Sequence, residues 1–306
     1  MNKPKKILIA YYTQSGQIKE ILDSFTKPFE NNENYEFYYH QIKPVNDYPF
    51  PWTSNEFFDA FPESVKEVGC KLQAFPEELN QNYDLIIIGL QAWYLSPSIP
   101  IAAFLQSQDF KTLANNTAVI TINACRNMWF MAHRSIRKFI EEAQAKYIGH
   151  LVLFDKVNNL VSVVTIMHWA FTGRKDKKWG FLPKPGIKDE DISGSEKYGQ
   201  LLKDKWEDGQ LNTLQQSYKD HHGVQVLPHL MSMETKAKRI FKIWTKFVTK
   251  KGGPGNPARQ KRLILFKYYL LFMIYFLSPI ATLIFYLTYP LFFLRIKKQI
   301  KFYQSV

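Results

Sequence analysis

The chain has 306 residues, a formal net charge of +13 and two cysteines, which supply neither a disulfide framework nor a metal set. Residues from Thr235 onward hold 15 of the 40 Lys and Arg and none of the 27 Asp and Glu, which leaves 25 basic and 27 acidic groups before them. Because the positive charge belongs to the C-terminal tail, composition argues against a nucleic-acid-binding domain and indicates a tail that seeks an anionic surface.

A turn near the N-terminus has the composition of a phosphate site. It consists of Thr13, Gln14, Ser15, Gly16 and Gln17, between an apolar run of strand length and a segment with apolar residues at helical spacing. Such a turn points backbone N–H groups and hydroxyls at the positive end of a helix, where a phosphate monoester binds. Neither GxGxxG nor Gly-Lys-Ser/Thr occurs here, which excludes a dinucleotide fingerprint and a nucleoside-triphosphate loop. The alternative is a polar turn without a ligand.

Residues 35–40 and 83–90 predict the second and third strands, and the Ile/Leu run of the third is typical of a central parallel strand. Between them, residues 44–62 hold four prolines and six aromatic residues, which either cover a planar ligand or pack on the sheet edge. The third strand is followed by Gln91, Ala92, Trp93 and Tyr94. Since ligands of doubly wound sheets bind beyond the carboxyl ends of the strands, we expect these four residues beside a ligand.

A fourth strand is predicted at residues 117–123, and an amphipathic helix follows it. The connection begins at Asn123 and contains Ala124, Cys125 and Arg126. Cys125 fits a small buried residue rather than a redox group.

These loops resemble those of flavodoxin-like proteins, in which hydroxyl residues and a glycine enclose the phosphate of FMN. The resemblance implies an α/β fold with a doubly wound parallel sheet of five strands in the order 2-1-3-4-5. It implies FMN as the cofactor, bound by the phosphate turn, by residues 91–94, and by Asn123, Ala124 and Arg126. Arg126 would then stabilise the negative charge of the reduced flavin, although a surface arginine at a helix start fits equally well. One departure is Ile18, where flavodoxins often have threonine.

The fifth strand stays open, because residues 151–154 and 161–166 are both apolar and the second run is a strand or a helix. Residues 156–192 exceed what a minimal flavodoxin needs, and we interpret them as an insertion that shapes a substrate pocket. The histidines at 221, 222 and 229 lack accompanying carboxylates or cysteines, so we expect no metal site.

The tail after residue 235 predicts membrane contact. Residues 236–251 form a basic amphipathic helix, with Ile240, Ile243, Trp244, Phe247 and Val248 on its apolar face, and residues 252–262 form a linker. The hydrophobic anchor, residues 263–306, contains 27 uncharged residues in a row, more than the about 20 that a spanning helix needs. Basic flanks and a central Ser-Pro favour a re-entrant or monotopic hairpin of two short helices, with both ends in the cytoplasm, over a single span. The alternative is a helical hairpin in the core of a soluble domain.

The whole arrangement resembles a narrower family. The YYTQSGQ and YLSPSIP loops and the WAFTG and LPKPG stretches are similar to those of flavodoxin-like aromatases of dialkylresorcinol and flexirubin biosynthesis. This resemblance implies an FMN-dependent oxidoreductase that converts a 2,5-dialkylcyclohexane-1,3-dione, made by a partner ketosynthase, into a dialkylresorcinol. Arg126 and Tyr94 are candidates for stabilising an enolate, and His133 or His168 for accepting a proton.

Two other functions remain open. One is an NAD(P)H- or quinone-linked flavin reductase, for example of the protoporphyrinogen-oxidase type, and the other is a non-catalytic, membrane-tethered scaffold or electron carrier. Since the short N-terminal apolar run is used as a strand and is too short for a signal peptide, we expect the body in the cytoplasm. We therefore expect the chain on the cytoplasmic face of the inner membrane, with a lipophilic substrate and no nucleic-acid partner.

Overall fold

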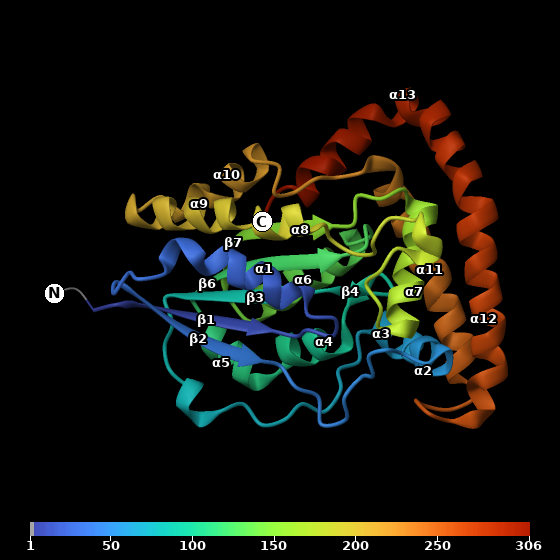
Figure 1. Ribbon diagram of the computed structural model, residues 1–306, viewed down its shortest axis with the longest axis horizontal. Coiled ribbons are helices and arrows are strands. Elements are labelled where there is room, and N and C mark those ends of the chain that lie inside the picture. Colours follow the sequence, from blue (N-terminus) through green and yellow to red (C-terminus); the bar gives the residue numbers. More distant parts are fainter. Residues whose placement is uncertain (1–2) are drawn as a thin grey trace.

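The computed structural model describes residues 3–306 and contains a parallel sheet with helices on both faces (Figure 1). Its strands are β1 (Lys5–Tyr11), β2 (Tyr35–Gln41), β3 (Leu85–Leu90), β6 (Ala118–Cys125) and β7 (Lys146–Phe154). They lie in the order β2-β1-β3-β6-β7. Counted within this sheet, that is the order 2-1-3-4-5 of the flavodoxin-like fold, so the predicted fold class is confirmed.

Alternate side chains of β1 point to opposite faces of the sheet and enter two separate cores. Ile7 and Ile9 pack with α1 (Gln17–Thr26), whereas Leu8 and Ala10 pack with the helices of the other face. The first core also contains α8 (Asp189–Ser193), α9 (Glu196–Glu207) and α10 (Leu214–Asp220), and the second contains α4 (Ile99–Gln106), α5 (Gln108–Ala114) and α6 (Phe130–Glu142). Every residue of β3 is buried, as its continuous apolar run predicts.

The fifth strand is β7, and the second apolar run is a helix, α7 (Asn159–Thr172). Residues 151–154 therefore belong to the sheet, whereas 161–166 lie inside α7. The start of this helix is set by Asn158, whose side-chain oxygen accepts a hydrogen bond from the N–H of Leu160 at 3.0 Å.

Most of the remaining helices gather beyond the carboxyl ends of the strands, on the right of Figure 1. They are α2 (Ser54–Asp59), α3 (Phe61–Lys66), α7, α11 (Pro228–Thr249) and α12 (Gln260–Phe272). Two short antiparallel strands, β4 (Ala92–Trp93) and β5 (Ser96–Pro97), follow β3 at the same end. These elements stand where doubly wound sheets hold their ligands.

The basic helix differs from the prediction in its length and in its buried face. α11 begins at Pro228 instead of residue 236, so the predicted domain boundary at residue 235 falls inside it. Ile243, predicted on the apolar face, is 68% exposed, whereas Glu234 and Lys238 are buried. These two charged residues are buried because they find partners on other elements, which the helical pattern alone does not reveal, whereas the exposed Ile243 stays available for the predicted membrane contact.

The tail is one continuous, bent helix, residues 260–303, rather than two helices joined by a loop, and we call this helix the rod. A π-helical segment, η6 (Met273–Leu277), connects α12 directly to α13 (Ser278–Tyr303). Pro279 does not break the rod because it lies in the first turn of α13, where its missing N–H is tolerated. A second proline, Pro290, lies inside α13 and removes a helical hydrogen bond, which permits bending. Figure 1 shows α13 turning back over the sheet.

Both ends of this rod are fixed to the α/β body. Arg259, in the predicted linker, is fully buried, and its guanidinium binds the carboxylates of Asp59 at 2.6 Å and Glu63 at 3.0 Å. At the other end, the hydroxyl of Tyr303 accepts a hydrogen bond from Arg134 at 2.7 Å. The predicted linker is thus a docked segment.

The middle of the rod is exposed. Within residues 3–306, the stretch Pro257–Tyr303 is the one helical segment long and apolar enough to cross a membrane, judged by length and composition. Only 6% of its most apolar 18-residue stretch is buried.

Candidate functional site

A cavity of about 570 Å³ lies where the loops after β1, β3 and β6 meet the helices beyond the sheet. This volume is within the range of small-molecule pockets. The structure brings ten of the twelve residues predicted to bind the cofactor to its wall: Thr13, Gln14, Ser15, Gln17, Gln91, Ala92, Trp93, Tyr94, Ala124 and Arg126. Gly16 lies within the phosphate turn, and Asn123 is buried at the end of β6.

The turn at the start of α1 has the geometry of an anion site. Gly16 has φ +90°, a conformation that favours glycine. A Cβ added there would have no atom closer than 3.8 Å, apart from those of the two adjoining residues. Its N–H donates to the hydroxyl oxygen of Thr13 at 3.0 Å. Within the described residues, α1 has no side-chain cap at its N-terminus. The first N–H groups of the helix are therefore available to a phosphate.

The side chain of Gln17 has a different role from the predicted one. It is buried, and its amide exchanges two hydrogen bonds with the backbone of Ile187, one of 2.8 Å and one of 3.2 Å. Gln17 thus holds the insertion against α1, which leaves its backbone N–H rather than its side chain for a ligand.

Among the buried amide oxygens that lack hydrogen-bond donors within residues 3–306, one lines the cavity and another directly precedes the lining residue Ala124. They belong to Gln91, after β3, and Asn123, at the end of β6, and both are buried. A buried acceptor without a donor is costly, so a ligand N–H placed here would be stabilising. Trp93 is fixed nearby by edge-to-face contacts with Tyr48 and Trp52, at centroid distances of 5.1 and 5.6 Å.

Tyr94 lines the cavity, but its hydroxyl is already engaged. The residue is in the left-handed region at φ 45°, and its hydroxyl donates to the carbonyl oxygen of Phe57 at 2.7 Å. Burial raises the pKa of Tyr94 well above its ordinary value, so the hydroxyl stays protonated. Tyr94 thus fixes the loop against α2.

Arg126 supplies positive charge to the cavity wall. It is partly buried, and its guanidinium donates to the backbone and side-chain oxygens of Asn159, at 3.2 and 2.7 Å, at the start of α7. Burial lowers the pKa of Arg126, and the carboxylate of Asp155 opposes that shift. Arg126 is thus attached to the start of α7 rather than fully exposed to solvent.

Neither predicted proton acceptor is among the lining residues. His133 is buried on α6 with its ring 4.2 Å from that of His150, and burial lowers the pKa of both imidazoles. His168 lies on α7 with Nε2 2.8 Å from a carboxylate oxygen of Asp176. Within residues 3–306, no group of three or more His, Cys, Asp or Glu has the arrangement of a metal site.

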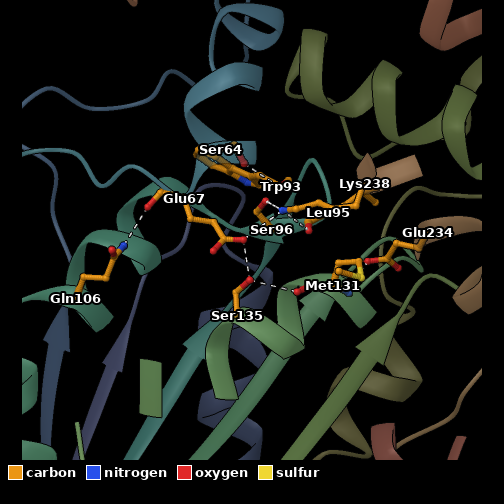
Figure 2. A network of polar contacts seen from close by, with 10 residues as sticks. All are labelled: Ser64, Glu67, Trp93, Leu95, Ser96, Gln106, Met131, Ser135, Glu234 and Lys238. Atoms are coloured by element: carbon orange, nitrogen blue, oxygen red, sulfur yellow. Dashed lines mark hydrogen bonds and ion pairs between the residues drawn. The ribbon is translucent and has the colours of Figure 1, made fainter. Parts of the chain in front are cut away.

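A polar network connects α11 to the loop that carries Trp93 and Tyr94. Figure 2 shows Lys238 reaching from α11 to this loop, where its ammonium donates to the carbonyl of Leu95 at 3.1 Å and to the hydroxyl of Ser96. The same ammonium binds Glu67, directly after α3, at 3.2 Å. Glu67 also accepts a hydrogen bond from Ser135 of α6 at 2.6 Å. Four segments are thus joined at one buried cation.

Glu234, one turn before Lys238 on α11, caps α6. Its carboxylate accepts hydrogen bonds from the N–H groups of Met131 at 2.7 Å and Phe130 at 3.2 Å. Burial raises the pKa of Glu234 to about 7, while these two N–H groups and the nearby Lys238 lower it. The helix needs this partner because Trp129, at its N-cap position, offers no side-chain cap.

Much of the cavity wall comes from outside the strand-end loops. The loop at residues 44–62 contributes Phe50, Trp52, Phe57, Phe58 and Ala60, and the insertion contributes Asn159, Val163, Ile166, Met167, Trp169, Ala170, Gly186 and Ile187. The tail completes the wall with Tyr269, Leu270, Leu271, Met273, Ile274, Leu277, Ser278 and Ala281. Residues 156–192, for which we predicted a pocket-shaping role, thus supply part of this wall. The contribution of the tail was missed, because an uncharged run gives no signal beyond hydrophobicity.

No family model and no curated protein matches the chain. Solved structures that resemble it include a Lactobacillus acidophilus flavoprotein in complex with FMN, which is 21% identical, covers 48% of this chain and 93% of its own, and has a TM-score of 0.37. An archaeal flavodoxin is 11% identical, with coverages of 66% and 99% and a TM-score of 0.36. Flavodoxin 1 from Bacillus cereus is 15% identical, with coverages of 64% and 95% and a TM-score of 0.32.

These TM-scores are too low for the similarities to establish the fold. The strand order establishes it instead. The chain is a flavodoxin-like α/β protein whose C-terminal rod forms part of the wall of the cavity beyond the sheet.

Proposed function

We propose that the protein is a membrane-associated, FMN-dependent oxidoreductase that oxidises a 2,5-dialkylcyclohexane-1,3-dione to a dialkylresorcinol. The observation that carries this proposal is one cavity whose wall includes both the phosphate turn and the apolar tail. Such a cavity suits a phosphorylated planar cofactor at one end and a lipophilic reactant at the other.

The residues present fit FMN. The uncapped N-terminus of α1, with Ser15 and Gly16, would hold the phosphate. The unsatisfied amide oxygens of Gln91 and Asn123 would accept hydrogen bonds from the N–H of the flavin ring. Ile18 lines the cavity as an apolar residue, so the phosphate would depend on the turn itself.

The reaction removes one proton and one hydride from the ring of the dione and leaves an aromatic diol. FMN, when bound, accepts the hydride. The guanidinium of Arg126 would stabilise the enolate that remains after the proton leaves. His133 does not line the cavity, so it would not be the group that takes this proton. Tyr94 would position the loop rather than transfer the proton, because its hydroxyl is bonded to Phe57.

A second candidate is an NAD(P)H- or quinone-linked flavin reductase. The observation that favours it is the aromatic lining, because Trp52, Trp93 and Trp169 would contact a flat quinone as well as a dione. This reductase would use the same flavin site as the proposed dione oxidase. NAD(P)H or a quinone, rather than a dione, would exchange hydride with the flavin.

The first test is the identity of the cofactor. The full-length chain, purified in detergent, is expected to release FMN in equimolar amount when it is denatured and analysed by mass. Gly16→Val is expected to lose FMN, because a β-branched residue is strained at φ +90° and its methyl groups occupy the turn. Gly253→Val is the matched control, since an added Cβ there meets no atom within 4 Å. A wild-type protein that does not take up FMN, or a Gly16→Val variant that keeps it, would contradict the flavin assignment.

A further inference from the structure

The attachment of the tail is incompatible with a simple membrane crossing. A spanning helix has its ends on opposite sides of a hydrocarbon layer about 30 Å thick. Here both ends contact the same folded body. Phe266 stacks on Phe61 at a centroid distance of 3.7 Å, and Tyr303 packs edge to face with Trp129 at 5.9 Å. The exposed stretch between these contacts therefore lies along a surface while the body stays folded.

The chemistry of this surface fits an anionic bilayer. Its large exposed apolar side chains include Phe272, Phe276, Ile280, Leu283, Leu287 and Leu291. Cations stand before and after them, at Arg262 and Arg295 for example, and α11 adds Lys242 and Lys246. No Asp or Glu occurs after Glu234. Apolar side chains bordered by lysine and arginine match acyl chains bordered by acidic headgroups.

The cavity opens at this same surface. Leu277 lines the cavity and is also 37% exposed, and Ala281, one turn later, is likewise lining and exposed. Lys236 of α11 is likewise both lining and exposed. Lining residues that are partly buried include Ile274 of the tail and Arg126 of the α/β body. The passage is therefore apolar at the tail and carries positive charge near the sheet.

We infer that this opening, between α11 and the segment from Met273 to Ala281, is a lateral portal through which a bilayer-dissolved substrate reaches the site. The inference rests on the proposed function for the identity of the reacting ring. The substrate class is an amphiphile with a flat, acidic carbocyclic head and long alkyl chains. The head enters toward Arg126, while the chains extend along Ile274 and Leu277 and remain in the acyl region. A portal of this kind spares the chains from crossing water.

The test compares two diones with FMN-loaded protein in air-saturated vesicles of anionic phospholipid, in which dissolved oxygen reoxidises the reduced flavin. One dione carries long alkyl chains and the other carries methyl groups. Ile274→Trp narrows the passage, and it is expected to lower kcat/KM for the long-chain dione about tenfold while the dimethyl dione and the FMN content are unaffected. Val68→Trp is the matched control outside the tail, because Val68 is 50% exposed and does not line the cavity. It is expected to change neither substrate. Ala281→Phe at the mouth repeats the test if Ile274→Trp does not fold.

The possible outcomes distinguish a failure of the portal proposal from a failure of the proposed reaction. If both diones slow equally, or if the long-chain dione is unaffected, the portal is contradicted. Binding of a dialkylresorcinol, measured by calorimetry in the same vesicles, gives a readout without turnover. If no dione is oxidised but resorcinol binding still strengthens with chain length and is lost in Ile274→Trp, the proposed reaction fails and the portal stands. Binding that is independent of chain length overturns the portal.

Discussion

Glu234 accepts hydrogen bonds from the backbone of Phe130 and Met131, more than a hundred residues earlier in the chain. Lys238, one turn later, binds the loop after β3. Both residues face the body although the helical pattern places charged residues outside. These buried charges are stabilised by the uncapped N–H groups of α6 and by the carbonyl of Leu95. Each of these backbone groups would otherwise lack a hydrogen-bond partner. Local periodicity contains no information about such distant partners.

Glu234 also predicts a pH dependence of stability. Its pKa is raised to about 7 in the folded protein from an ordinary value of 4.5, so the folded state binds more protons between these values. The stability that this group contributes is therefore full below its unfolded pKa and is lost as pH rises through about 7. Relative to Glu234→Gln, which does not titrate, the wild type is expected to lose about 1–3 kcal/mol of unfolding free energy between pH 5 and pH 8. Denaturation of both proteins across this range in one detergent is the measurement, and parallel profiles would contradict the prediction.

At the site, sequence reasoning succeeded where the signal is local. The phosphate turn and the loops after two strands are contiguous stretches, and the parallel sheet brings the ends of its strands to one edge. It did not predict the amide of Gln17 bonded to Ile187, or the hydroxyl of Tyr94 bonded to Phe57. His133 has the chemistry of a proton acceptor, but the direction in which it faces depends on how α6 packs against His150.

Among the elements, the contact between α1 and α9 depends on one glycine. An added Cβ on Gly199 would lie 1.8 Å from the carbonyl oxygen of Phe25. Gly199→Ala is therefore expected to force the two helices apart and to lower the free energy of unfolding by about 3 kcal/mol. Gly253→Ala, where an added Cβ meets no atom within 4 Å, is expected to change it by less than about 0.5 kcal/mol. Thermal or denaturant unfolding distinguishes them, and equal stability of the two variants would show that this close approach is not rigid.

The elements also show the limits of hydrophobic patterns. The apolar run of β7 and that of α7 have similar composition, and only the capping by Asn158 and the available strand position separate them. In the tail, Ser278-Pro279 predicted a break. The break is absent because η6 precedes it and Pro279 falls in the first turn of the next helix. A proline stops a helix only where its N–H is needed.

For the whole molecule, the fixed ends of the tail predict a reversible, salt-sensitive attachment to membranes. Leu287→Glu places a charge on the exposed apolar strip and is expected to weaken binding to anionic vesicles about tenfold, with FMN content and thermal stability unchanged. Gln210→Glu makes the same charge change at an exposed position near α9 and is expected to have no effect. Co-sedimentation with vesicles at two salt concentrations is the measurement. Equal binding of both variants would contradict a membrane contact through the tail.

The central claim is that FMN and a lipophilic dione meet in the cavity beyond the sheet. It is tested most directly by rapid anaerobic mixing of the FMN-loaded wild-type protein, in anionic vesicles, with a long-chain 2,5-dialkylcyclohexane-1,3-dione. The proposed function predicts loss of the visible absorbance of the oxidised flavin and formation of the dialkylresorcinol in equimolar amount. A flavin that stays oxidised with the dione, yet is reduced by NAD(P)H and reoxidised by a quinone, would contradict the claim and identify the protein as a reductase.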